Sequence, residues 1–192
     1  VPEPYIVKGT STYYGDDGKP RGQWVKTTLD QRRMEEATRA AVEAMSQDIK
    51  RERPAKPPKR CVDDLCTLYT LTDCHVGMRE WGKETGDDWD LDIAERTLIG
   101  AFRHMVDASP PAAVGVVAQL GDFLHWDSLA AQTPTSGHLV DADSRYSKVI
   151  QVAIRVLRYV VRMALEKHSR VVLLVAEGNH DVSGSVWMRH LF

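Results

Sequence analysis

Cysteine is scarce in this chain of 192 residues. It occurs only at positions 61, 66 and 74, and no two of these positions have the Cys-x-x-Cys spacing. An odd number of cysteines without such a pair argues against a disulfide framework and against a structural zinc knuckle. The pattern therefore indicates a reducing, cytoplasmic setting.

Long apolar runs are also lacking. The longest fall far short of the roughly 20 residues that a membrane-spanning helix needs, and the chain opens with no signal-peptide pattern. We therefore expect no membrane partner. The first residue is Val rather than Met, which favours an internal fragment or a processed product of a longer protein.

A strong net charge is the third missing feature. The formal charge is −2, so no global basic field argues for nucleic acid. The balance is nevertheless uneven, with 13 Lys and Arg against 9 Asp and Glu in residues 1–60, and 12 against 18 in residues 61–192. A cation site would produce such an acidic region, and scattered surface acids would give the same total.

The first 60 residues are predicted to form an arm. Residues 5–28 alternate apolar and polar side chains around Gly15-Asp16-Asp17-Gly18, which predicts a β-hairpin. A helical apolar stripe follows from about residue 30 to Pro54. Residues 53–60 are rich in Pro and Lys, as is typical of an extended linker. We place the domain boundary here, with an arm at 1–60 and the main domain at 61–192.

The main domain alternates predicted strands and helices. The apolar, β-rich runs are residues 66–72, 114–120 and 171–176. Helical patterns separate them, one opened by a capping box of Asp92 and Glu95 and one spanning residues 144–168. This order favours an α/β domain with a largely parallel sheet, helices on its faces and ligands at the carboxyl ends of the strands.

Three short polar blocks directly follow the three predicted strands. They are Asp73-Cys74-His75, Gly121-Asp122-Phe123-Leu124-His125 and Gly178-Asn179-His180-Asp181. Because parallel strand ends meet at one edge of a sheet, the blocks are expected to converge. Carboxylate, amide and imidazole groups are ligands for hard or borderline divalent cations. The blocks therefore predict a metal-dependent site.

The spacing within the first two blocks supports this prediction. Asp73 and His75 are two residues apart, so in an extended segment their side chains point the same way and can bind one cation. Asp122 follows Gly121, whose missing side chain permits a sharp turn. The carboxylate of Asp122 is then placed to bridge two cations.

The third block adds a neutral ligand and an acid–base group. Asn179 supplies an amide oxygen where further negative charge would repel a phosphate. His180 can act as a proton donor or charge stabiliser. We expect Asp181 to orient His180, and we expect Cys74, in the middle of the first block, to point away from the metals.

Taken together, the blocks resemble the D-x-H, G-D-x-x-H/D and G-N-H-D/E motifs of the calcineurin-like metallophosphoesterase superfamily, over roughly residues 64–184. The resemblance implies that Asp73 and His75 bind a first metal, that Asp122 bridges, and that Asn179 binds a second. It implies that His180 contacts the scissile phosphate.

The resemblance also implies a fold and a reaction. The fold is a metallophosphoesterase-type sheet core flanked by helices. The cofactors are two divalent metal ions, with manganese favoured and iron, zinc, magnesium or nickel as alternatives. The reaction is hydrolysis of a phosphoester by in-line attack of a metal-activated hydroxide, without a phosphoenzyme.

The family pattern also has a later lone His and a G-H-x-H block, which supply the remaining nitrogen ligands. The chain ends at Phe192 without them. Two explanations stay open. The chain is a truncated piece of a longer enzyme with an incomplete sheet, which we favour, or it is a degenerate binding or assembly module that cannot hold two metals.

The substrate class is predicted from the second block. His125 stands where many phosphatases of the family carry Asp, and Leu71-Thr72-Asp73-x-His75-x-Gly77 resembles the DNA-repair nuclease branch. This favours His125 as a catalytic group and DNA or RNA as the partner. The alternatives are that His125 is an ordinary packing residue beside Trp126 and that the substrate is a phosphomonoester. A basic stripe in residues 144–168 either meets phosphates or is simply solvated, and the oligomeric state is undecided.

Overall fold

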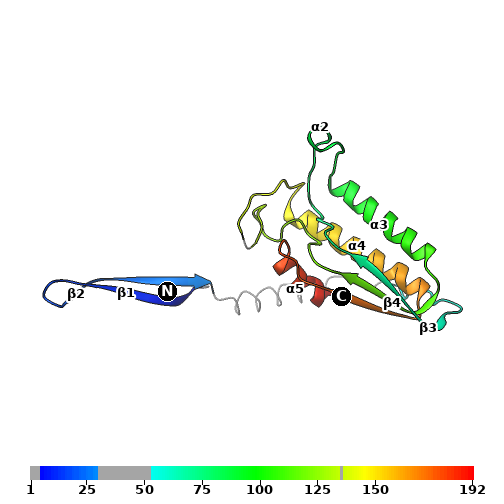
Figure 1. The fold of residues 1–192 in the computed structure, drawn as a ribbon, viewed down its shortest axis with the longest axis horizontal. Helices are drawn as coiled ribbons and strands as arrows, with labels where there is room; N and C mark the ends of the chain where they lie inside the picture. The colour runs from blue at the N-terminus through cyan, green and yellow to red at the C-terminus, as the bar shows by residue number, and fades with distance from the viewer. Residues whose placement is uncertain (1–4, 30–52, 135) are drawn as a thin grey trace. The chain divides into compact units, whose positions relative to one another are not determined.

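A computed structural model of the protein describes residues 5–29, 53–134 and 136–192 (Figure 1). The chain divides into two compact units, Val1–Ile49 and Lys50–Phe192, whereas the boundary predicted from sequence follows residue 60. The helix predicted between residue 30 and Pro54 lies outside the described residues. The linker residues 53–61 have no regular secondary structure and lead directly into the first strand of the second unit.

A β-hairpin makes up the described part of the first unit, as predicted. Strand β1 (Tyr5–Tyr14) pairs antiparallel with β2 (Pro20–Leu29). The turn is closed by backbone hydrogen bonds from Gly15 to Lys19 and from Gly18 to Gly15, both 2.9 Å. Gly18 has a φ of +73°, a conformation that glycine adopts without strain. The side chains of Tyr13, Tyr14 and Trp24 in this hairpin are exposed.

The second unit contains a three-stranded parallel sheet in the order β3-β4-β5 (Figure 1). The strands are β3 (Val62–Leu71), β4 (Ala112–Gln119) and β5 (Arg170–Val175). Leu68 pairs with Val116, and Val116 pairs with Val172. The three predicted strands and their parallel arrangement are therefore confirmed within the described residues. Since the strands are parallel, the loops that follow them lie at one end of the sheet.

Two long helices cover one face of the sheet. These are α3 (Leu91–Ala108) and α4 (Tyr146–Lys167), which pack against each other (Figure 1). The buried ring of Tyr69 in β3 lies 5.2 Å from that of Phe102 in α3, measured between centroids. The long predicted helix over residues 144–168 thus corresponds to α4, and its apolar stripe is the buried one.

The start of α3 differs from the prediction. Asp90 is the N-cap, and its side chain accepts a hydrogen bond of 2.7 Å from the backbone nitrogen of Ile93. The capping box predicted for Asp92 and Glu95 is therefore wrong. Glu95 instead accepts two hydrogen bonds from Arg155 in α4, at 2.9 and 2.7 Å. The carboxylate of Glu95 therefore pairs with Arg155 of α4 instead of accepting a hydrogen bond from the backbone at the start of α3.

Two further helices were not predicted from the sequence. The short α2 (Gly82–Thr85) lies in the segment between β3 and α3, and α5 (Val182–Leu191) follows the third polar block directly. Trp187 and Met188 of α5 are buried. Among the helices in the described part of the chain, none is long and apolar enough to cross a membrane.

The second face of the sheet is open to solvent in the described structure. Leu68 is 64% exposed, and Val172 and Leu174 in β5 are 37% and 45% exposed. These residues lie on the face opposite Tyr69, because neighbouring residues of a strand point to opposite faces. Parallel sheets are ordinarily covered on both faces, so this sheet has one packed face and one exposed apolar face.

Candidate metal centre

The loops after β3 and β4 run side by side at the carboxyl end of the sheet. The backbone nitrogen of His75 donates to the carbonyl of Asp122 at 3.0 Å, and that of Val76 donates to Phe123 at 2.8 Å. His125 donates back to Val76 at 3.1 Å. This parallel ladder continues the pairing of the two strands past their ends, so the first two polar blocks are adjacent.

Asp181 joins the third block to the second. Its Oδ2 accepts from the backbone nitrogens of Phe123 and Leu124, at 2.8 and 3.1 Å, and its Oδ1 accepts from Gly178 at 3.1 Å. The side chain is fully buried. Because buried N–H groups need partners, this carboxylate fixes the relative position of the two loops.

The ring of His180 is oriented by a different group from the one expected. Its Nδ1 donates to the backbone carbonyl of His125 at 2.8 Å, while the carboxylate of Asp181 is occupied by backbone donors. The backbone nitrogen of His180 donates to Oδ1 of Asp122 at 2.9 Å. Asp181 therefore holds the backbone of the loop that carries His180, whereas the carbonyl of His125 orients the imidazole ring of His180.

Three site residues have left-handed backbone conformations. The φ angles are +51° for Asp73, +43° for His75 and +49° for Asp122. The expectation that Asp73 and His75 lie in an extended segment is therefore wrong, although their side chains still converge. Such conformations cost on the order of 1–3 kcal/mol each for residues other than glycine, and they are concentrated at functional sites.

Glycine is required where the second and third blocks meet. Gly121 has a φ of +108°, which confirms the sharp turn predicted there, and a Cβ on it would lie 3.2 Å from the Cα of Gly178. A Cβ on Gly178 would collide with the backbone nitrogen and the carboxylate of Asp122. The two glycines let the two loops pack backbone against backbone.

The predicted metal ligands from the first two blocks come together. Asp73, His75 and Asp122 each offer a ligand atom, and these atoms lie within 4.8 Å of one another. Two carboxylates and one imidazole suit a divalent cation such as Mn²⁺ or Mg²⁺. Asn179 is exposed in the same loop as His180, and its role as a ligand stays a prediction.

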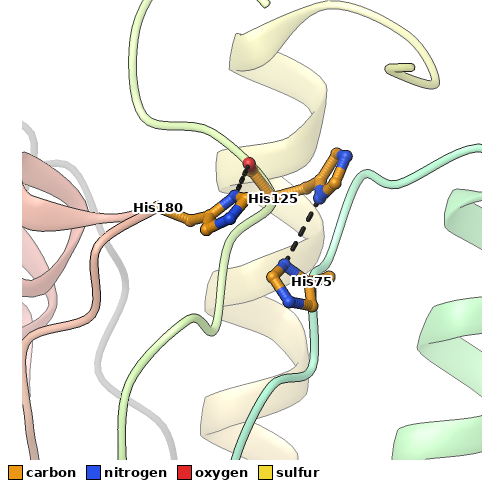
Figure 2. Close-up of side chains that lie close together, drawn as sticks. All are labelled: His75, His125 and His180. Atoms are coloured by element: carbon orange, nitrogen blue, oxygen red, sulfur yellow. Dashed lines mark hydrogen bonds between the residues drawn. The ribbon is translucent and has the colours of Figure 1, made fainter. Parts of the chain in front are cut away.

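A group of three histidines lies beside these carboxylates. Figure 2 shows His75, His125 and His180 approaching from three separate loops. The Nδ1 atoms of His75 and His125 are 3.3 Å apart, and ligand nitrogens of all three rings lie within 4.8 Å of one another. The rings of His125 and His180 are stacked, with centroids 5.5 Å apart. The sequence placed each residue near the site but did not predict this group.

Burial keeps two of these rings uncharged. Desolvation, followed by the charges of the neighbouring His75 and His180, lowers the pKa of His125 to about 4. The pKa of His75 is also lowered, first by burial and then by His180, against the opposing effect of Asp122 and Asp73. Neutral imidazoles carry lone pairs, so at pH 7 these side chains are electron-pair donors rather than cations.

Cys74 lies between Asp73 and His75, two of the predicted metal ligands. Burial, together with the nearby carboxylates of Asp73 and Asp181, raises the pKa of its thiol to about 12. Its Sγ is 3.8 Å from the carbonyl oxygen of Thr72. The thiol is therefore protonated at neutral pH.

Asp127 joins the loop after β4 to the start of α5, a role that the sequence did not reveal. Its Oδ2 accepts from the backbone nitrogens of Ser183 and Gly184, at 2.5 and 3.2 Å, and its side chain is buried. These donors belong to the first turn of α5, where backbone N–H groups have no partner within the helix. Asp127 thus caps α5 in place of Asp181, whose side chain is used elsewhere.

The basic stripe of α4 is partly neutralised. Arg155 forms a bidentate ion pair with Glu95, and Arg162 pairs with Glu166 at 3.3 Å. These contacts satisfy guanidinium groups that the nucleic-acid interpretation would direct at phosphates. The solvated interpretation of the stripe is therefore favoured at these positions.

Comparison of the chain with protein-family models, with curated proteins and with solved structures finds no match.

Proposed function

We propose that this chain carries the metal-binding half of a phosphoesterase site of the calcineurin-like metallophosphoesterase type. The observation that supports this most strongly is the convergence of Asp73, His75 and Asp122. Asp73 and Asp122 are 49 residues apart in the sequence, yet the ligand atoms of all three residues lie within 4.8 Å of one another at the carboxyl end of the sheet. His180 approaches the same point from the third loop (Figure 2). The order of the three polar blocks along the chain matches the family's motifs.

The donor set fits divalent cations. Asp73 and His75 would hold one ion, Asp122 would bridge, and Asn179 would serve a second, with manganese as the favoured metal. When bound, such ions polarise the phosphoryl oxygens and activate water for in-line attack. Oδ1 of Asp122 already accepts from the backbone of His180, so its Oδ2 is the atom free of that bond and available for a cation.

His180 is assigned to the substrate. Because Nδ1 donates to the carbonyl of His125, Nε2 is the ring atom left to face a phosphoryl oxygen or a leaving group. A fixed ring costs little reorganisation during the reaction, which makes a hydrogen bond or proton transfer from this atom more effective. His125 contributes by holding this ring through its backbone.

The favoured substrate is a nucleic-acid phosphodiester, and the supporting observation is His125 in the second block. A phosphomonoester, from a phosphoprotein or a small molecule, is the alternative with the same chemistry. A non-catalytic module is the alternative from another class. The three differ in what the protein hydrolyses: a phosphodiester, a phosphomonoester, or neither.

The test combines metal binding with turnover. Calorimetric titration of the chain with Mn²⁺ should show weak binding, since part of the family's nitrogen ligand set is not in this sequence. Hydrolysis of single-stranded DNA, of a chromogenic phosphodiester and of a chromogenic phosphomonoester would be measured with Mn²⁺ present. Asp122→Asn should remove both Mn²⁺ binding and turnover, whereas Asp107→Asn, at an exposed position of α3, should change neither. Manganese binding that survives Asp122→Asn would contradict the assignment.

A further inference from the structure

The three-histidine group offers a donor set different from the carboxylate-rich one. His75, His125 and His180 present nitrogen alone, whereas Asp73 and Asp122 present oxygen. His75 is the member that both groups share. Imidazole suits zinc, copper, nickel and iron, while carboxylates suit magnesium and manganese. The two groups thus differ in the class of cation that they favour.

The separation of two of these nitrogens matches a known coordination geometry. Zinc binds imidazole nitrogen at about 2.0–2.1 Å in a tetrahedral arrangement, so two nitrogens on one zinc ion are roughly 3.3–3.4 Å apart. The Nδ1 atoms of His75 and His125 are 3.3 Å apart. The third ligand nitrogen lies within 4.8 Å of them, so the three rings need to close by no more than about 1.5 Å to reach this spacing.

The remaining ring is already prepared as a ligand. A metal-binding histidine almost always donates its other ring N–H to a carboxylate or a backbone carbonyl, which fixes the tautomer and directs the lone pair. His180 makes this contact from Nδ1 to the carbonyl of His125, and Nε2 is left to bind (Figure 2). The rings of His125 and His180 are stacked on each other, and both lie edge-on to the ring of His75.

We propose that His75, His125 and His180 form a nitrogen-only site for a borderline divalent cation of the zinc class, which overlaps at His75 with the carboxylate site that favours manganese. Three protein nitrogens leave a fourth tetrahedral position open to water or an anion. Because His75 belongs to both groups, an ion on the three nitrogens excludes the manganese arrangement. It also binds the Nε2 of His180 that the substrate would otherwise meet.

A regulatory consequence follows, and it rests on the proposed function. Zinc should inhibit a manganese-dependent phosphoesterase reaction at this site, and excess manganese should relieve the inhibition only by displacing zinc. The binding site itself does not depend on the reaction, so it is tested by spectroscopy on the chain without any substrate.

The test uses Co²⁺ as a visible stand-in for zinc. Tetrahedral Co²⁺ absorbs visible light strongly and octahedral Co²⁺ weakly, so the intense spectrum should appear on titration of the chain and disappear when Zn²⁺ is added. His125→Ala should weaken Co²⁺ and Zn²⁺ binding by about 100-fold or more, since even an outer partner of a ligand is worth about 10–100-fold. This substitution keeps the backbone carbonyl that holds His180.

Matched variants separate the two sites. Asp73→Asn should keep the tetrahedral spectrum and lose Mn²⁺ binding, whereas His125→Ala should do the reverse. His104→Ala, at an exposed position of α3, should change neither. Thermal unfolding of each variant, followed by circular dichroism, confirms that a lost signal does not reflect an unfolded chain.

The opposite results would overturn the proposal. Octahedral Co²⁺ in the wild type, or a tetrahedral spectrum that survives His125→Ala and disappears in Asp73→Asn, would assign zinc to the carboxylates. A tetrahedral spectrum in a chain that neither binds Mn²⁺ nor hydrolyses any ester would support the zinc site and contradict the proposed function. The two failures are therefore distinguishable.

Discussion

Gly178 lies directly against Asp122, so that a single added methyl group at residue 178 would occupy the space of the Asp122 backbone nitrogen and carboxylate. This contact joins the loop after β5 to the loop after β4 at the candidate metal ligand itself. It explains physically why the third block begins with glycine.

Gly178→Ala should therefore disturb both stability and the metal centre. We expect a loss of about 1–3 kcal/mol in the free energy of unfolding, as for other overpacked sites, together with weaker Mn²⁺ binding. The matched control is Gly100→Ala, because a Cβ at this position of α3 meets nothing within 4 Å. That control should gain about 0.5–1 kcal/mol through helix propensity. Urea unfolding and calorimetry would measure the two effects, and equal stability in both variants would contradict the packing argument.

Two aspartates of the site should differ in what their removal changes, with Asp181 affecting mainly stability and Asp73 mainly Mn²⁺ affinity. Asp181→Ala leaves the buried backbone nitrogens of Phe123 and Leu124 without acceptors, which should cost about 3 kcal/mol of unfolding free energy. Asp73 is exposed, so Asp73→Ala should cost less than about 1 kcal/mol while lowering Mn²⁺ affinity. Chemical unfolding and metal titration of both variants would check this, and a stable Asp181→Ala protein would disprove the organising role of that carboxylate.

The buried cap of α5 should make stability depend on pH. Burial raises the pKa of Asp127 above its ordinary value, against the lowering effect of the backbone hydrogen bonds from Gly184 and Ser183. A carboxyl group with a raised folded-state pKa binds its proton more tightly when folded. Its stabilising contribution is therefore complete below the unfolded-state pKa of about 3.9 and falls as the pH rises through the folded-state value.

Asp127→Asn removes this titration while keeping an oxygen acceptor for the α5 nitrogens. We expect the variant to become more stable relative to the wild type as the pH rises from about 4 to 7. Urea unfolding across this range would measure the difference, with Asp107→Asn as the exposed control. A difference that shrank towards neutral pH would show that the carboxylate is stabilised, not penalised, by its surroundings.

A buried polar chain at the other end of the sheet should contribute to stability. His168 donates from Nδ1 to the carbonyl of Ala112 at 2.8 Å, so its Nε2 accepts from the hydroxyl of Tyr69 at 2.7 Å. Tyr69→Phe leaves this nitrogen buried and unpaired and should cost about 1–3 kcal/mol. Leu68→Thr, on the exposed face, should stay within about 0.5 kcal/mol. Comparable losses in thermal unfolding would contradict the assignment of the two faces.

The role of His180 predicts a separation of kinetic effects. In the protein assayed with Mn²⁺, His180→Ala should lower kcat by about 10²–10⁴ and change Mn²⁺ affinity far less, because the proposed manganese ligands are other residues. His190→Ala, at an exposed position of α5, serves as the control. Steady-state kinetics with a phosphodiester and parallel Mn²⁺ titration would test this, and an unchanged kcat would remove His180 from the reaction.

The sequence by itself determined the alternation of strands and helices, since apolar runs bounded by Gly, Pro and polar blocks are local patterns. It also placed the three polar blocks after β3, β4 and β5, and it located the sharp turn at Gly121. The helix cap at Asp90 and the helix α5 were not predicted. Both depend on which carboxylate reaches which backbone nitrogen, and neighbouring candidates such as Asp92 look equivalent in the sequence.

Only the tertiary structure decided how the site is held together. The left-handed conformations of Asp73 and His75, the use of Asp181 and Asp127 as acceptors for backbone N–H groups, and the approach of His75 to His125 depend on contacts between loops about 50 residues apart. Such contacts leave no periodic pattern in a sequence, because each pair is specified only once the sheet has brought the strand ends together. The residue types thus determined which chemistry is available, and packing decided which atoms remain free to perform it.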